Sequence, residues 1–153
     1  EDNIFLPQNF GKNCLCYTGT HDNDTTLGWY EKLPVDQKDL FKKLVPEKHN
    51  SPVLNLISFA MNSKAEIVII PFTDYLELNS DCRINTPSVP KGNWEWRFES
   101  QDITENLKEK IRNIRNNDFG IFIKLLQIFT KQSTMLLQIS NFQPVSQFPT
   151  ECS

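Results

Sequence analysis

One short run of β-branched residues, Ile-Val-Ile-Ile at residues 67–70, constrains the fold more than any other feature of this chain. The run does not alternate between apolar and polar residues. It therefore predicts a strand over residues 66–70 that is buried on both faces, as strands are in a parallel sheet covered by helices. A shorter β-prone run at residues 14–17 predicts a second buried strand. The expected fold class is α/β.

The segments around these strands carry helical patterns. Apolar residues recur at helical spacing in residues 33–45, which predicts a first helix. Ser51 and Pro52 then offer an N-cap and a proline at the first position of a second helix. A short helical turn is expected at residues 73–79, and an amphipathic helix at residues 103–114. Strands joined by long helical crossovers form the βαβ arrangement.

A dense polar stretch, YTGTHDNDTTLGW at residues 17–29, follows the first strand and places His21 beside Asp22. Such a pair at a strand end suits carbohydrate chemistry. The carboxylate accepts hydrogen bonds from sugar hydroxyls that strengthen as the ring gains oxocarbenium character, and the histidine donates to another hydroxyl. A metal site built from His21, Asp22 and Asp24 is disfavoured, because neighbouring residues of an extended chain point to opposite sides.

The tryptophans and cysteines allow more than one interpretation. The tryptophans at positions 29, 94 and 96 are either platforms for sugar rings or core residues, and core is the commoner role. Cys14 and Cys16 form a lone CxC pair, and the other two cysteines, Cys82 and Cys152, complete no zinc-ligand spacing. We therefore interpret the cysteines as buried free thiols of a protein in a reducing compartment. We expect neither a metal nor a cofactor.

Composition narrows the class of protein. The 153 residues fit one ordinary domain, with 39% apolar and 23% charged residues. A net charge of -3 argues against a nucleic-acid partner. No apolar stretch reaches the ~18 residues that a membrane span needs, and no secretory signal is visible. The cytoplasm is the expected location. The chain starts at Glu1 without a methionine, which we interpret as the start of a fragment.

Several motifs together resemble the 4-alpha-glucanotransferase family, also known as amylomaltases or disproportionating enzymes. They are the stretch at residues 17–29, IIPFTD at residues 69–74, RINTP at residues 83–87 and GNWEWR at residues 92–97. The resemblance runs from about Asn3 to Ile114. It implies the carboxyl-terminal portion of a (β/α)8 barrel, with the two strands as the seventh and eighth. It also implies retaining transfer of an α-1,4-glucan segment to a 4-hydroxyl of glucose or another glucan.

The resemblance assigns roles to individual residues. Asp22 matches the carboxylate that stabilises the transition state, and His21 matches the adjacent substrate-binding histidine. Asn85 matches an asparagine of the donor-sugar subsites. For Asn23 two roles stay open: contact with sugar, or support of the loop. The partner is an α-1,4-glucan or maltooligosaccharide, and the location is a plastid instead of the cytoplasm if the source is a plant. Ser88 stands where the family usually has glycine.

The resemblance has two limits: two catalytic groups of the family are missing, and residues 118–153 have no counterpart in it. The family's nucleophile and general acid/base have no counterpart in the chain, so the isolated chain is expected to be inactive. We therefore keep a second interpretation, a truncated, non-catalytic remnant that at most binds glucan weakly. The expected domains are residues 1–117, as part of the catalytic barrel, and residues 118–153, as a divergent tail. For the tail we expect a packing helix, a partner-binding or interfacial helix, or sequence outside the fold.

Overall fold

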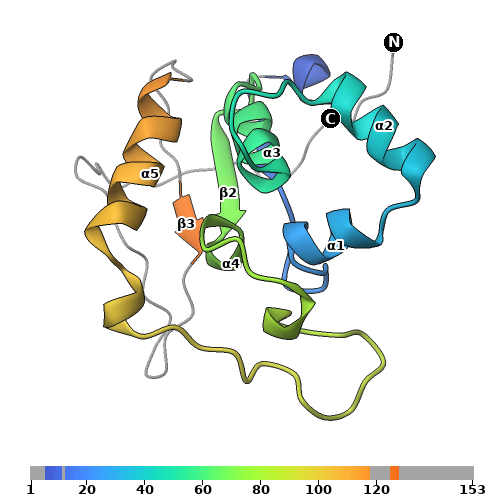
Figure 1. Ribbon diagram of the computed structural model, residues 1–153, viewed down its shortest axis with the longest axis vertical. Coiled ribbons are helices and arrows are strands. Elements are labelled where there is room, and N and C mark those ends of the chain that lie inside the picture. Colours follow the sequence, from blue (N-terminus) through green and yellow to red (C-terminus); the bar gives the residue numbers. More distant parts are fainter. Residues whose placement is uncertain (1–5, 12, 118–124, 128–153) are drawn as a thin grey trace.

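The computed structural model describes residues 6–11, 13–117 and 125–127. Its centre is a parallel sheet with strand order β1-β2-β3, formed by Leu15–Tyr17, Ile67–Pro71 and Leu125–Gln127 (Figure 1). Cys16 pairs with Val68, and Ile70 pairs with Leu126. The two strands expected from the sequence are thus present as β1 and β2, and they are parallel neighbours.

Helices connect and follow these strands. Between β1 and β2 lie α1 (Thr26–Lys32), α2 (Val35–Leu44) and α3 (Pro52–Met61). The short α4 (Phe72–Tyr75) begins directly after β2, and α5 (Glu105–Asn117) comes later in the chain. The described part of the chain also contains three short 3-10 helices: η1 (Pro7–Asn9), η2 (Ser80–Cys82) and η3 (Ser100–Asp102). The βαβ order expected from the sequence is therefore the order observed.

Local sequence explains where the central helices begin. The Ser51 side chain accepts a hydrogen bond from the Leu54 amide at 3.5 Å, with Pro52 at the first position of α3. The Thr25 hydroxyl accepts from the Gly28 amide at 3.1 Å and so caps α1.

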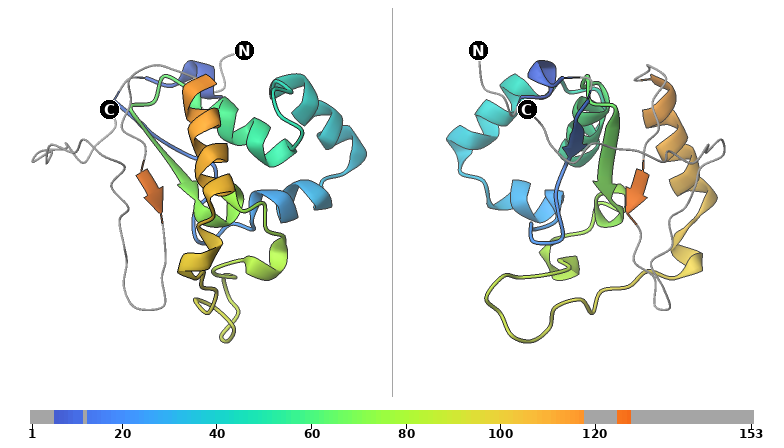
Figure 2. Two further views of the ribbon diagram at one scale, coloured as in Figure 1. Left: turned by 60° about the vertical axis from the view of Figure 1, so that its left-hand side comes forward. Right: turned by 180° about the vertical axis from the view of Figure 1, so that it is seen from behind.

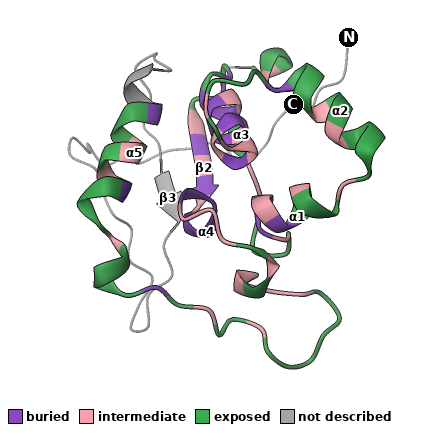
Figure 3. Cartoon of the chain, viewed as in Figure 1, coloured by how far each residue is buried: buried purple, intermediate pink, exposed green. Residues whose placement is uncertain are grey.

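The core lies on one side of the sheet. Buried residues of β1, β2, α3 and α5 form a single apolar cluster that includes Cys16, Val68, Ile57 and Ile114. Figure 3 shows the buried residues gathered on α3, β2 and α4. The alternate residues of the strands are more open, with Leu15 52% and Tyr17 47% exposed. Burial on both faces was expected for residues 66–70, but in β2 the residues alternate between buried and half-buried. In the described part of the chain, the helices cover one face of the sheet.

Helix α2 is the helix expected at residues 33–45. Its apolar residues have the spacing of a buried face, yet no residue of α2 is buried. Leu40 is 54% and Leu44 is 44% exposed, while Val45, just beyond the helix, is 4% exposed. The views in Figures 1 and 2 place α2 at the periphery, away from the sheet. Periodicity predicts the face that a helix can bury, whereas the neighbouring elements decide whether that face is covered.

Strand β3 corrects the expectation for the tail. Leu125, Leu126 and Gln127 were expected to be helical or outside the fold, but they pair in parallel with Ile69, Ile70 and Pro71 of β2. An unpaired strand edge offers a row of N–H and C=O groups, and pairing with it outweighs the weak preference of leucine for helix. The other tail residues, and with them Cys152, lie outside the described residues.

Of the three described cysteines, only Cys16 is the buried thiol expected from the sequence, while Cys14 and Cys82 are half-buried. Cys14, Cys16 and Cys82 are free. Cys16 points into the core, and burial raises the pKa of its thiol to about 11, although a hydrogen bond with Ser63 works against that shift. A thiol with such a pKa stays protonated at neutral pH, so Cys16 is an inert core residue.

Candidate functional site

The two chemistry-bearing loops begin at the same end of the sheet. The loop between β1 and α1 carries His21 and Asp22, and the segment after α4 carries Arg83 and Asn85. The carboxyl ends of parallel strands meet at one edge, which is where α/β proteins gather their ligand-binding loops. The structure brings these loops into direct contact, although they are about sixty residues apart in the sequence.

Asp22 is the centre of the contact. Its Oδ1 accepts a hydrogen bond from the Asn85 side-chain amide at 2.5 Å and lies 3.4 Å from His21 Nε2. The side chains of His21 and Asp22 are 45% and 50% exposed. The Trp94 ring lies beside the imidazole of His21, with centroids 5.1 Å apart and planes inclined by 37°. The result is an exposed carboxylate with an amide, an imidazole and an indole around it.

Arg83 connects the backbones of the two loops. Its guanidinium donates to the main-chain carbonyl of Asp22 at 2.6 Å, while its Nε donates to the carbonyl of Asn85 at 2.9 Å. Sequence reasoning gave Arg83 no role, although it stands two residues before Asn85. Its geometry shows that it fixes the distance between the two site residues and leaves the Asp22 carboxylate available.

The next residues of the first loop hold the loop itself. The Asn23 side-chain oxygen accepts from the amide and the hydroxyl of Thr20, at 2.7 and 2.9 Å. Asp24 accepts from Lys32 at 2.6 Å and from the Ser80 hydroxyl at 2.9 Å. Burial raises the pKa of Asp24, but these two hydrogen bonds and one from the Thr25 amide outweigh burial and lower it. Asp24 is thus held as a carboxylate in an ion pair.

A close approach between α1 and η2 brings the second loop against the first. A Cβ atom on Gly28 would lie 2.2 Å from the Ser80 hydroxyl oxygen and 2.9 Å from the Ser80 amide nitrogen. Only glycine leaves room for this contact, because one of the two clashing atoms is backbone. The position of Gly28 at the start of α1 therefore sets how closely the segment carrying Asn85 can approach the Asp22 loop.

Asp74, the last residue of the IIPFTD motif, is buried at 1% exposure. It accepts three hydrogen bonds from the other loop, one from the Thr26 amide and two from the hydroxyls of Thr26 and Thr18. Burial raises the pKa of Asp74, and these bonds offset only part of the shift. A buried carboxylate of this kind has a specific task, because burying a charge is costly.

The tryptophans divide between the two expected roles. Trp96 is half-buried and packs against the core, with its ring centroid 6.3 Å from that of Phe98. Trp94 and Trp29 are 45% and 43% exposed, so the core interpretation is wrong for both. Only Trp94 lies at the site, against His21. Trp29, in α1, instead lies against Phe41 of α2.

Ser88 has a backbone φ of 67°, in the left-handed region that favours glycine. We expect Ser88→Gly to stabilise the chain by about 1 kcal/mol. It releases a strain of about 1–2 kcal/mol but increases the freedom of the unfolded chain by about 0.5–1 kcal/mol. Urea denaturation measures the difference. Ser88→Ala is the matched control, because it removes the hydroxyl and keeps the strain. Equal stability of the glycine and alanine variants would contradict the prediction.

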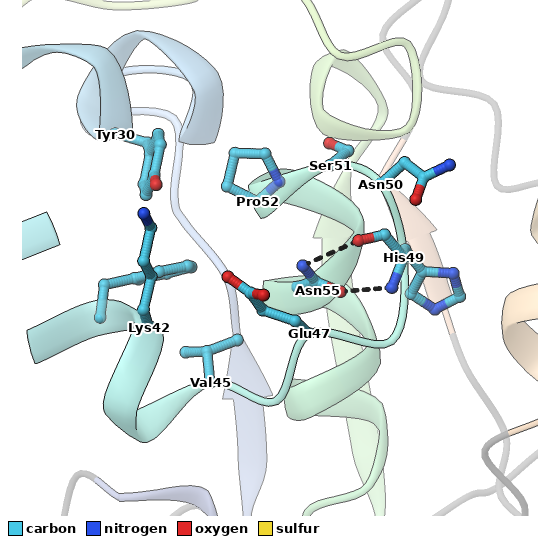
Figure 4. A pocket seen from close by; sticks show the side chains of 10 residues that line it. Tyr30, Lys42, Val45, Glu47, His49, Asn50, Ser51, Pro52 and Asn55 are labelled. Carbon is cyan, nitrogen blue, oxygen red and sulfur yellow. Dashed lines mark hydrogen bonds between the residues drawn. The ribbon is translucent and has the colours of Figure 1, made fainter. Parts of the chain in front are cut away.

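A hollow of about 270 Å³ lies elsewhere, between α1, α2 and the start of α3 (Figure 4). Asn55 on its wall already uses its side chain to bind the backbone of His49, with distances of 2.7 and 3.1 Å. The ring of His49 points away from the other labelled side chains, and Lys42 points toward Tyr30 (Figure 4). The polar groups of the hollow therefore hold the connection between α2 and α3, and we assign the function to the Asp22 loop.

Two further findings concern the described residues. Among residues 6–11, 13–117 and 125–127, no group of three or more histidine, cysteine, aspartate or glutamate side chains is arranged to hold a metal ion. In the same part of the chain, no helix has the length and apolarity needed to cross a membrane.

Comparison with known proteins gives a consistent result. The family model described as 4-alpha-glucanotransferase matches residues 1–104. A chloroplastic/amyloplastic 4-alpha-glucanotransferase of Solanum tuberosum is 40% identical over 116 residues, which is 75% of this chain and 20% of that protein. The 4-alpha-glucanotransferase of Synechocystis is 41% identical over 105 residues, 67% of this chain and 21% of that protein.

A solved structure agrees with the sequence matches. The amylomaltase from Streptococcus agalactiae in complex with acarbose is 32% identical, with a TM-score of 0.69, and the match covers 74% of this chain and 23% of that one. The chain therefore spans about a fifth of the length of the curated relatives that it matches.

Proposed function

Since the chain belongs to the 4-alpha-glucanotransferase family, we propose that it is the carboxyl-terminal part of an enzyme that transfers α-1,4-glucan segments with retention. In this proposal Asp22 is the carboxylate that stabilises the transition state, and His21 and Asn85 bind the donor sugar. Residues 1–117 belong to the catalytic barrel and residues 118–153 form a divergent tail. The compartment is the cytoplasm, or the plastid if the source is a plant.

The observation that carries the proposal is the cluster at the Asp22 carboxylate. The Asn85 amide donates to Oδ1 at 2.5 Å, His21 lies 3.4 Å away, and half of the carboxylate is exposed. An exposed carboxylate held from one side is free to accept hydrogen bonds from the hydroxyls of a sugar on the other. Such bonds strengthen as the anomeric carbon gains positive charge, which lowers the barrier. The indole of Trp94 offers an apolar surface beside it.

The open face of the sheet supports the barrel. Parallel strands are normally covered on both faces, yet Leu15 and Tyr17 of β1 are about half exposed. In a (β/α)8 barrel the helices cover the outer face of each strand, and side chains of the other strands fill the interior. The one-sided core of this chain is what two neighbouring strands of such a barrel present. We therefore keep β1 and β2 as the seventh and eighth strands of the proposed barrel.

The test is a hybrid enzyme. Residues 1–117 replace the matching carboxyl-terminal segment of the full-length Solanum tuberosum relative, and glucose release from maltotriose reports transfer. We expect the hybrid to retain measurable activity, because it unites the upstream part of that protein with the Asp22 cluster. A folded hybrid without transfer activity would overturn the proposal. Reversion of its residues 1–117 to the potato sequence is the control for correct assembly.

Strand β3 favours the second candidate, a non-catalytic remnant that binds glucan weakly. Leu126 pairs with Ile70, so the tail of this chain occupies the edge of β2. In a closed barrel that edge would pair with another barrel strand. A second hybrid that also carries residues 118–153 distinguishes the candidates. Lower activity than in the first hybrid would favour the remnant, and equal activity would favour the enzyme.

A further inference from the structure

The loop with the proposed catalytic carboxylate is attached at both of its ends to a single buried side chain. Asp74 follows β2 in α4, and it is 1% exposed. Its Oδ2 accepts from the Thr18 hydroxyl at 3.2 Å, on the β1 side of the loop. Its two oxygens accept from the Thr26 amide at 2.9 Å and hydroxyl at 2.7 Å, at the start of α1. Asp74 thus joins the two ends of the loop, at Thr18 and Thr26.

From this geometry we propose that Asp74 is a positioning residue, which holds the loop of residues 18–26 so that Asp22 and His21 lie opposite Asn85 and Trp94. The idea extends the proposed function, because it assigns a task to a residue that touches neither Asp22 nor the open side of the site. It names which part of the fold sets the geometry: the end of β2, acting through two threonines.

The choice of residue type supports this task. Thr18 and Thr26 present two hydroxyls and one amide to the same point, and a carboxylate accepts from all of them without supplying a proton of its own. Burial raises the pKa of Asp74, so the carboxylate carries a cost that an apolar residue of similar size would avoid. A side chain needed only for packing would not have to be acidic.

The other contacts of the loop act at different points. Asn23 bonds within the loop, to Thr20, and Asp24 bonds to Lys32 and Ser80. Arg83 holds the carbonyl of Asp22 from the second loop. Among the described residues, Asp74 alone is hydrogen-bonded to both Thr18 and Thr26, at the two ends of the loop. Loss of its acceptors should therefore shift the pair relative to Trp94 while the core around Ile57 stays intact.

The experiment measures this shift without any glucan, so it is independent of whether the chain binds or transfers one. The chain has two histidines, and only His21 lies against an indole, whose ring current displaces its ring-proton resonances. His49, between α2 and α3, is an internal reporter of the fold. Proton–carbon NMR of the 153-residue chain resolves both, and His49→Gln assigns them.

Four variants complete the test. We expect Asp74→Ala and Thr26→Val to move the His21 resonances toward those of a histidine in denatured protein, with His49 unchanged. Thr26→Ser keeps the hydroxyl, and Asp39→Ala removes an exposed acid from α2, so both should leave His21 in place. An unchanged His21 in the first two variants would overturn the proposal. So would a joint movement of His21 and His49, because Asp74 would then support the whole fold.

Discussion

The 153-residue chain by itself is expected to release no glucose from maltotriose above the rate without protein. Retaining transfer needs a nucleophilic carboxylate and a general acid/base about 5 Å apart. The two acidic side chains nearest in sequence and fold already have hydrogen-bond partners and do not supply these groups. Asp24 forms a 2.6 Å ion pair with Lys32, and Asp74 is buried and hydrogen-bonded to the threonines. A positioned general acid or base alone accelerates such a reaction by ~10²–10⁴-fold. Without either group, we expect no measurable release of glucose.

The measurement is a long incubation at high protein concentration, with glucose quantified against a blank. Asp22→Asn is the matched control, since it changes the proposed site by a single atom type. Release of glucose by the chain that disappears in Asp22→Asn would contradict the prediction. It would mean that another carboxylate of the chain reaches the sugar bound at Asp22.

The second large effect is expected in the hybrid enzyme that carries residues 1–117. There Asp22→Asn should lower kcat by about 10²–10³, because the hydrogen bonds to a developing oxocarbenium supply several kcal/mol and each 1.36 kcal/mol is tenfold in rate. KM should change much less, since the stabilisation belongs to the transition state. Initial rates over a range of maltotriose concentrations separate the two constants.

Asp39→Asn is the control for this second prediction, because it removes an exposed carboxylate from α2 without touching the site. A raised KM at unchanged kcat would contradict the role given to Asp22. It would show that the carboxylate binds the ground state and the transition state equally, as an ordinary sugar ligand does.

Local signals in the sequence predicted a large part of this molecule. The β-branched run became β2, Ser51 and Pro52 began α3, and Leu107 and Ile114 face the core from α5, as their spacing indicated. The family was recognisable from the motif at residues 17–29 and its companions, and the family match over residues 1–104 confirms it. These signals are local, because strand, cap and helix preferences depend on neighbours in the chain.

Sequence reasoning missed contacts between distant segments. Arg83 joins the two loops across 61 positions, and Asp74 reaches Thr26 across 48. Nothing in a local pattern distinguishes such residues from solvated charges. The pairing of β3 with β2 was missed for the same reason, since Leu125 pairs with Ile69, a residue 56 positions earlier in the chain. The roles of His21, Asp22 and Asn85 stay predictions until the hybrids are measured.

By itself the sequence determined the class of fold, the family, strands β1 and β2, and helices α2, α3 and α5, because each depends on residue types at short spacing. The tertiary structure alone decided which apolar faces are covered, which charges are buried and which side chains meet at Asp22. Those outcomes depend on how separate segments pack against one another. A carboxylate such as Asp74 becomes a support for the site only once β2 has brought it beneath the loop that follows β1.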